Sequence, residues 1–318
     1  MPLLRRLLGE PPPTPDAARV PWELTELLRE GSPPVELRRP WGEYLDVALL
    51  IAHGPDRPRG NGLPGELSEA LSEHDVRVRK VTGPMAREAA NADVVLAYGW
   101  PAAPAMLRLP GLRARAVLAT AAPAPLAELG WTAGVPVIGP AWMGGVLPAG
   151  TDAAYTPMPV HRREDLVLVH GEEPLGLLAA AELHARRPDL AFAVSGVREA
   201  LELPFPYLPV ERGAEAQAHA FASATVAIAP PVRGWRPAAL AMLACGQAVV
   251  APADEASRVA LGDAASLVAG PLEAADAVEE LLGDLALRAE RARLGFERAP
   301  GGWGATARAM VSAFLDPP

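Results

Sequence analysis

A short polar stretch, Arg233-Gly234-Trp235-Arg236, precedes a predicted helix that ends near Cys245. The unpaired amides at a helix start attract anions, and a guanidinium group can hold a phosphate or carboxylate through two parallel hydrogen bonds. The indole could also stack on a sugar or a base. These four residues are therefore a candidate binding site for an anionic or aromatic ligand. The alternative is that the arginines cap an exposed loop and that Trp235 packs against a neighbouring domain.

Two of the six histidines, His53 and His170, follow predicted strands, where ligand sites of α/β proteins usually lie. Either could act as a base or hydrogen-bond a ligand, but either could instead be a structural histidine with its partners satisfied. The other four histidines, including His74 and His184, are predicted at the surface of helices or in linkers.

The glycine loop "GNGLPG" contributes Gly60, Gly62 and Gly65 and matches the dinucleotide pattern G-x-G-x-x-G. That pattern needs its first glycine directly after a strand, whereas "HGPDRPRG" separates the strand from Gly60, and no acidic residue follows the next strand. Dinucleotide binding is therefore disfavoured. The loop either opens a helix, or turns its backbone amides towards a phosphate in a cleft between domains.

Composition excludes several classes of function. The chain has 318 residues, half of them hydrophobic, and a net charge of −9 with its basic residues spread along the chain, which disfavours nucleic-acid binding. Lys80 is the single lysine, so a phosphate-binding loop lysine or a Schiff-base lysine is nearly excluded. With Cys245 as the single cysteine, no internal disulfide can form, and a cytoplasmic location is expected.

Neither a metal site nor a cofactor is predicted. No transmembrane segment is predicted either, because the longest uncharged stretch, 129–151, is broken by prolines and glycines.

Hydrophobic runs alternate with amphipathic segments, which predicts an α/β fold. Residues 1–45 form a proline-rich extension with one predicted helix, "PWELTELLREG". Strands are predicted at 46–52, 76–81, 92–99, 115–120 and 135–140, and after a polar linker at 148–165 the alternation resumes. We expect two Rossmann-like, doubly wound parallel-sheet domains facing a cleft, at 46–150 and 151–302.

Several segments in order resemble the GT-B glycosyltransferases, most closely the retaining family 4. They are "VLPAGTDAAY" (146–155), "ARRPDLAFAVSG" (185–196), the region 222–270 with "ACGQAVVAP", and "GGWGATARAMVSAFL" (301–315). The resemblance implies the GT-B fold, sugar transfer from a nucleotide sugar, and a last helix, 303–318, that crosses back to the first domain.

The same resemblance implies donor-site groups whose positions are changed here. An arginine would follow Gly171 and a lysine would precede Gly176, but Glu172 and Leu175 occupy those positions. The family's two glutamates align with Arg233 and Ala241, and its histidine with the alanines at 121–122.

Three functions stay open on these grounds. The protein is a glycosyltransferase with an altered donor site, acting from a nucleotide sugar on a glycan, lipid or protein acceptor. Alternatively, it is a non-catalytic relative that binds an anionic small molecule or a protein partner such as an active glycosyltransferase. A nucleotide-dependent enzyme of another reaction class is the third possibility.

Overall fold

The structure is a computed structural model, and it describes residues 44–51, 65–82, 88–89, 91–99, 102, 106, 109, 115–118, 137–143, 145, 147–197, 199–299 and 301–315. The described residues form two compact units. The N-terminal unit comprises the described part of 44–150 with 233–235 and 301–315, and the C-terminal unit comprises 151–232 and 236–299. The predicted extension at 1–45 lies almost wholly outside the described residues.

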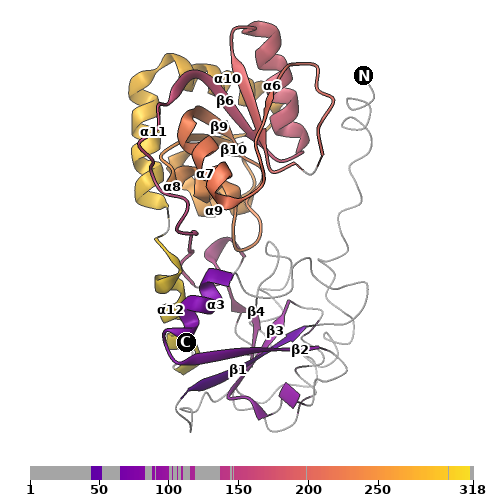
Figure 1. Ribbon diagram of the computed structural model, residues 1–318, viewed down its shortest axis with the longest axis vertical. Coiled ribbons are helices and arrows are strands. Elements are labelled where there is room, and N and C mark those ends of the chain that lie inside the picture. Colours follow the sequence, from indigo (N-terminus) through magenta and orange to yellow (C-terminus); the bar gives the residue numbers. More distant parts are fainter. Residues whose placement is uncertain are drawn as a thin grey trace. The chain divides into compact units, whose positions relative to one another are not determined.

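A parallel sheet forms the centre of the N-terminal unit (Figure 1). Its strands are β1 (Leu45–Ile51), β2 (Val76–Thr82), β3 (Val94–Tyr98), β4 (Arg115–Leu118) and β5 (Val137–Ile138), in the order β2-β1-β3-β4-β5. Strands β1 and β3 are buried almost throughout, as expected for a parallel sheet covered on both faces. Helix α3 (Gly65–Ser72) packs against α12 (Trp303–Leu315), so the end of the chain completes this unit.

The C-terminal unit contains a second parallel sheet, in the order β11-β10-β9-β6-β7-β8. Its strands are β6 (Arg163–His170), β7 (Ala191–Ser195), β8 (Leu208–Pro209), β9 (Ala224–Ile228), β10 (Ala248–Pro252) and β11 (Ala265–Val268). The order changes direction around β6, which is the feature that defines a doubly wound sheet. The predicted fold class, with two parallel-sheet α/β regions, is confirmed.

Helices cover both faces of the second sheet. Helices α6 (Pro174–Arg186) and α10 (Pro271–Gly283) pack against each other and share one hydrophobic core with β6, β7, β9 and β10. The other helices are α7 (Ala214–Ser223), α8 (Ala238–Ala244), α9 (Glu255–Leu261) and α11 (Leu285–Arg298), with α8 and α11 packed on β10. Short 3-10 helices lie at Ala141–Met143 and Gly262–Ala264.

Helix α8 ends where the sequence predicts. Cys245 caps its last turn, and Gly246 follows with a φ of 76°, a conformation that favours glycine. Burial raises the pKa of the Cys245 thiol to about 12, so this cysteine behaves as a small buried hydrophobic residue. Within the part of the chain that the structure describes, no helix is long and apolar enough to cross a membrane.

Candidate functional site

His170 lies at the carboxyl end of β6, and its imidazole is already engaged. Its Nδ1 is 2.8 Å from the Oγ of Ser195, which ends the neighbouring strand β7 and is fully buried. The ring also meets Phe221 edge-on, with centroids 5.8 Å apart. Burial lowers the pKa of His170 from 6.5 to about 4, so the imidazole is neutral at physiological pH. These contacts favour the structural alternative for this histidine.

The backbone beside His170 depends on glycine. A Cβ at Gly196, where φ is 73°, would lie 2.7 Å from both Cε1 and Nε2 of the His170 ring. Gly171 also has a positive φ, 86°, but a Cβ there would meet no atom within 4 Å. Gly196 therefore makes room for the imidazole, whereas the turn at Gly171 opens onto free space.

Helix α6 begins directly after this open turn. Its N-cap, Glu173, makes no side-chain capping hydrogen bond, and Pro174 occupies the first turn. The amides of Leu175 and Gly176 belong to the first turn, where a helix offers no internal acceptors. Glu172 is exposed on the same turn, so two carboxylates stand at the positive end of the helix.

Gly176 has a packing role. It is buried, and a Cβ on it would lie 2.9 Å from Cγ1 of Val169 in β6. The glycine allows helix and strand to approach closely, independently of any ligand.

The residues of segment 233–236 lie in different environments, some exposed and some buried. Arg233 is exposed, and Gly234 has a φ of 67° and accepts a hydrogen bond of 3.0 Å from the Nε1 of Trp142. The Trp235 side chain is only 8% exposed, which leaves little of the indole face for stacking on a ligand. This burial disfavours the interpretation in which Trp235 stacks on a ligand.

Arg236 contacts a carboxylate of the linker. Its Nη1 lies 3.4 Å from Oδ2 of Asp152, whose side chain is 12% exposed, while the Arg236 side chain is 44% exposed. Desolvation lowers the pKa of Arg236, which still leaves it charged at neutral pH. A ligand anion at Arg236 would have to compete with Asp152.

Tyr155 extends this linker cluster. Its hydroxyl donates to Oε1 of Gln217 at 3.0 Å, and its ring stacks on Phe221 at 5.7 Å between centroids. Burial, and then the nearby charge of Asp152, raise the pKa of Tyr155. Phe221 thus lies between Tyr155 and His170 and connects the linker to the end of β6.

Other predicted site residues are placed as follows. Gly65 is the first residue of α3, is exposed, and has no atom within 4 Å of an added Cβ, which fits a helix start. His53, Gly60 and Gly62 lie outside the described residues. His184 departs from its predicted surface position: it is half-buried, packs against Phe192 and Phe205, and its Nδ1 is buried without a hydrogen-bond partner.

Sequence reasoning missed Ser195 and Gln217. The signal for Ser195 was its place at the end of the predicted strand 190–196, parallel to the strand that carries His170. No group of three or more His, Cys, Asp or Glu residues that could hold a metal ion occurs among the described residues.

Comparison with known proteins identifies the fold. No protein-family model matches the chain, and the search of curated proteins gives no match. A sucrose-phosphate synthase from Thermosynechococcus elongatus superimposes with a TM-score of 0.63 at 16% identity, covering 85% of this chain and 98% of that one. HepE from Anabaena, in complex with UDP and glucose, gives a TM-score of 0.57 at 12% identity, with 85% and 99% covered.

A structure described as a putative UDP-N-acetylglucosamine 2-epimerase from Listeria monocytogenes is also similar. Its TM-score is 0.52 at 11% identity, covering 85% of this chain and 95% of that one. At these identities the likeness shows the fold alone. The chain has the GT-B fold of glycosyltransferases, as the ordered sequence motifs predict.

Proposed function

We propose that this protein binds the donor of a glycosyl transfer, a nucleotide sugar, at the carboxyl end of β6 and the start of α6, and transfers its sugar from an altered donor site. The observation that carries the proposal is the start of α6, where the N-cap residue Glu173 makes no side-chain capping hydrogen bond and the open turn at Gly171 comes just before the helix. HepE, which shares the fold, is in complex with UDP and glucose, and this supports the same ligand class here.

Main-chain amides can replace part of the missing cationic contacts. A helix start presents N–H groups and the positive end of a dipole, and both favour a diphosphate. The amides of Leu175 and Gly176 belong to the first turn of this helix of 13 residues. We therefore assign diphosphate binding to the backbone of α6, where the family resemblance implies arginine and lysine side chains.

A second function is favoured by one specific observation, which is the charge of the same turn. Glu172 and Glu173 are both exposed beside the open turn, and a carboxylate there repels a diphosphate. In this alternative the protein has lost transfer activity and binds another ligand or a protein partner, such as an active glycosyltransferase.

Thermal unfolding with a panel of nucleoside diphosphates and nucleotide sugars tests binding. A ligand at a hundred times its dissociation constant stabilises the folded state by about 2.7 kcal/mol. We expect one member to raise the unfolding temperature, and Glu172→Gln to increase that shift because it removes a repulsive charge. Glu202→Gln is the matched control, since Glu202 is an exposed loop acid outside this turn. No shift with any member at millimolar concentration overturns the binding proposal.

Transfer is tested separately with the donor that binds. Release of free nucleotide that depends on an added acceptor supports catalysis, and Glu172→Gln should increase it. Binding without turnover, across donor hydrolysis and acceptor panels, selects the non-catalytic alternative. The non-catalytic alternative is excluded if transfer is detected and if Arg233→Ala abolishes the rise in unfolding temperature that the ligand causes.

A further inference from the structure

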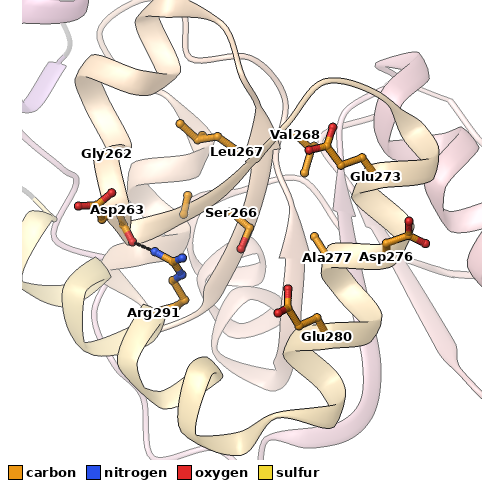
Figure 2. Close-up of a pocket in the computed structure, with 11 residues that line it drawn as sticks. Gly262, Asp263, Ser266, Leu267, Val268, Glu273, Asp276, Ala277, Glu280 and Arg291 are labelled. Atoms are coloured by element: carbon orange, nitrogen blue, oxygen red, sulfur yellow. Dashed lines mark hydrogen bonds between the residues drawn. The ribbon is translucent and has the colours of Figure 1, made fainter.

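The end of the second sheet forms a groove. A surface pocket of about 650 Å³ lies along β11, between α10 and the first half of α11 (Figure 2). Four consecutive residues of β11, Ala265 to Val268, line it. A sheet face presents alternate residues, so a run of consecutive residues means that the groove follows the strand edge. β11 is the terminal strand of its sheet, which agrees with this reading.

The groove carries an excess of negative charge. Asp263, Glu273, Asp276 and Glu280 line it, against a single cation, Arg291. Figure 2 shows Glu273 and Glu280 on the side of α10 that faces β11, whereas the Asp276 carboxylate points away from that strand. Glu273 and Glu280 are seven residues apart, which places them on one face of the helix about 10 Å apart along its axis.

Only some of these carboxylates already have a hydrogen-bond or ion-pair partner. Oε2 of Glu273 accepts from the amide of Ala269 at 2.7 Å, and Oδ1 of Asp276 accepts from Arg186 at 2.6 Å. Arg291 donates to the main-chain oxygen of Asp263, leaving the carboxylate of that residue exposed. Glu280 is exposed, and its carboxylate has no hydrogen bond or ion pair with any described residue. It is the group best placed to receive a cation.

We propose that this groove, defined by β11 and the acidic face of α10, is a docking surface for a basic, extended segment of a partner protein. The segment adds as a further strand at the edge of β11 that pairs with no described strand, where main-chain hydrogen bonds hold it. Alternate residues of an extended chain are about 6.4–6.8 Å apart, so three of them span about 13 Å. Basic side chains at that spacing can reach the carboxylates of Glu273 and Glu280.

Charge selects this occupant over a second copy of the chain. Pairing two β11 edges would bring two acidic grooves together, and like charges that face each other are destabilising. The short length of β11, four residues, limits the added strand to a few main-chain bonds, so the ion pairs must contribute to affinity. Binding should therefore weaken as salt concentration rises.

A labelled hexapeptide of alternating arginine and valine is the probe, measured by fluorescence anisotropy with the full chain. We expect Glu280→Lys to weaken binding about fivefold or more, because it removes an attraction and adds a repulsion. Glu202→Lys is the control, since it makes the same change of net charge at an exposed loop position and should leave binding unchanged. Equal affinities of the wild type and Glu280→Lys overturn the proposal, and so does equal weakening by both variants.

A second probe separates strand addition from charge attraction alone. The same hexapeptide with every backbone amide methylated keeps its charges but cannot donate main-chain hydrogen bonds. We expect its binding to be lost, and we expect the unmethylated peptide to slow amide exchange at Leu267, because the N–H groups of Ser266 and Val268 face β10 and that of Leu267 faces the opposite edge. Equal binding of the two peptides contradicts strand addition and overturns the proposal, as does failure of the unmethylated peptide to bind at millimolar concentration.

Discussion

At the scale of single residues, the neutral state of His170 follows from its surroundings. Burial lowers its pKa to about 4, whereas the unfolded chain has the ordinary value of 6.5. Between these values the unfolded state binds the extra proton, so stability is fully present above pH 6.5 and falls as pH drops towards 4. The largest expected decrease in the free energy of unfolding is about 3 kcal/mol.

His170→Gln should remove this contribution. Glutamine keeps a polar partner for Ser195 but does not titrate. Urea unfolding of both proteins from pH 4 to pH 7 measures the effect: the wild type should lose more stability than the variant over that interval. Parallel curves would show that His170 is not held neutral in the folded state.

A pair of glycines tests the contact between the His170 ring and the backbone. Gly196→Ala and Gly171→Ala both place an alanine at positive φ, which costs about 1–2 kcal/mol. Only the first puts a methyl group 2.7 Å from the His170 ring, which Ser195 and Phe221 hold in place. We expect Gly196→Ala to be the more destabilising in urea unfolding by about 1 kcal/mol or more. Similar losses for both would mean that the ring moves aside freely.

At the scale of elements, the sequence predicts most strands and helices because their signals are local. The apolar runs at β1, β3, β6 and β9 and the helical spacing of α6, α10 and α11 match the structure closely. The short strands β8 and β11 and the helix α9 were not predicted. β8 has two residues and β11 four, and "ASLV" carries too few residues to show a period. Their pairing depends on neighbours that are distant in sequence.

Arg162 shows how one linker side chain completes two helices. Its guanidinium donates to the carbonyls of Ala222, Cys245 and Gly246, at the ends of α7 and α8. Arg162→Lys can satisfy only some of these carbonyls and should lower the free energy of unfolding by about 1–3 kcal/mol. Arg163→Lys is the control. Among the described residues the Arg163 side chain pairs with the exposed Asp165 alone, so this substitution should change stability by less than about 0.5 kcal/mol. Equal effects in urea unfolding would contradict this capping role.

At the scale of the whole molecule, the sequence predicts the edge of the sheet where a site is expected but not the contacts made there. The predicted ends of the strands at His170 and Ser195 meet at one edge of the sheet, because β6 and β7 are parallel neighbours. The sequence could not show that Ser195 already holds His170, that Asp152 meets Arg236, or that Trp235 is buried. Each of these facts is a contact between distant segments, which periodicity and local motifs do not encode.

The end of the chain belongs to the N-terminal unit, and this gives the last prediction. In α12, Trp303, Ala307, Met310 and Phe314 are buried, and the helix packs against α3. Phe314→Ala should destabilise this unit by about 3–5 kcal/mol, because it leaves a cavity in a packed core. Phe296→Ala makes the same change where the side chain is 58% exposed, in α11 of the C-terminal unit, and should cost less than about 0.5 kcal/mol. Hydrogen exchange with increasing urea reads the two units separately. In Phe314→Ala, the backbone amides of β1 and β3 should lose their protection from exchange at a lower urea concentration, while those of β6 and β9 keep theirs. An equal loss of protection in both sheets would show that the two units unfold together.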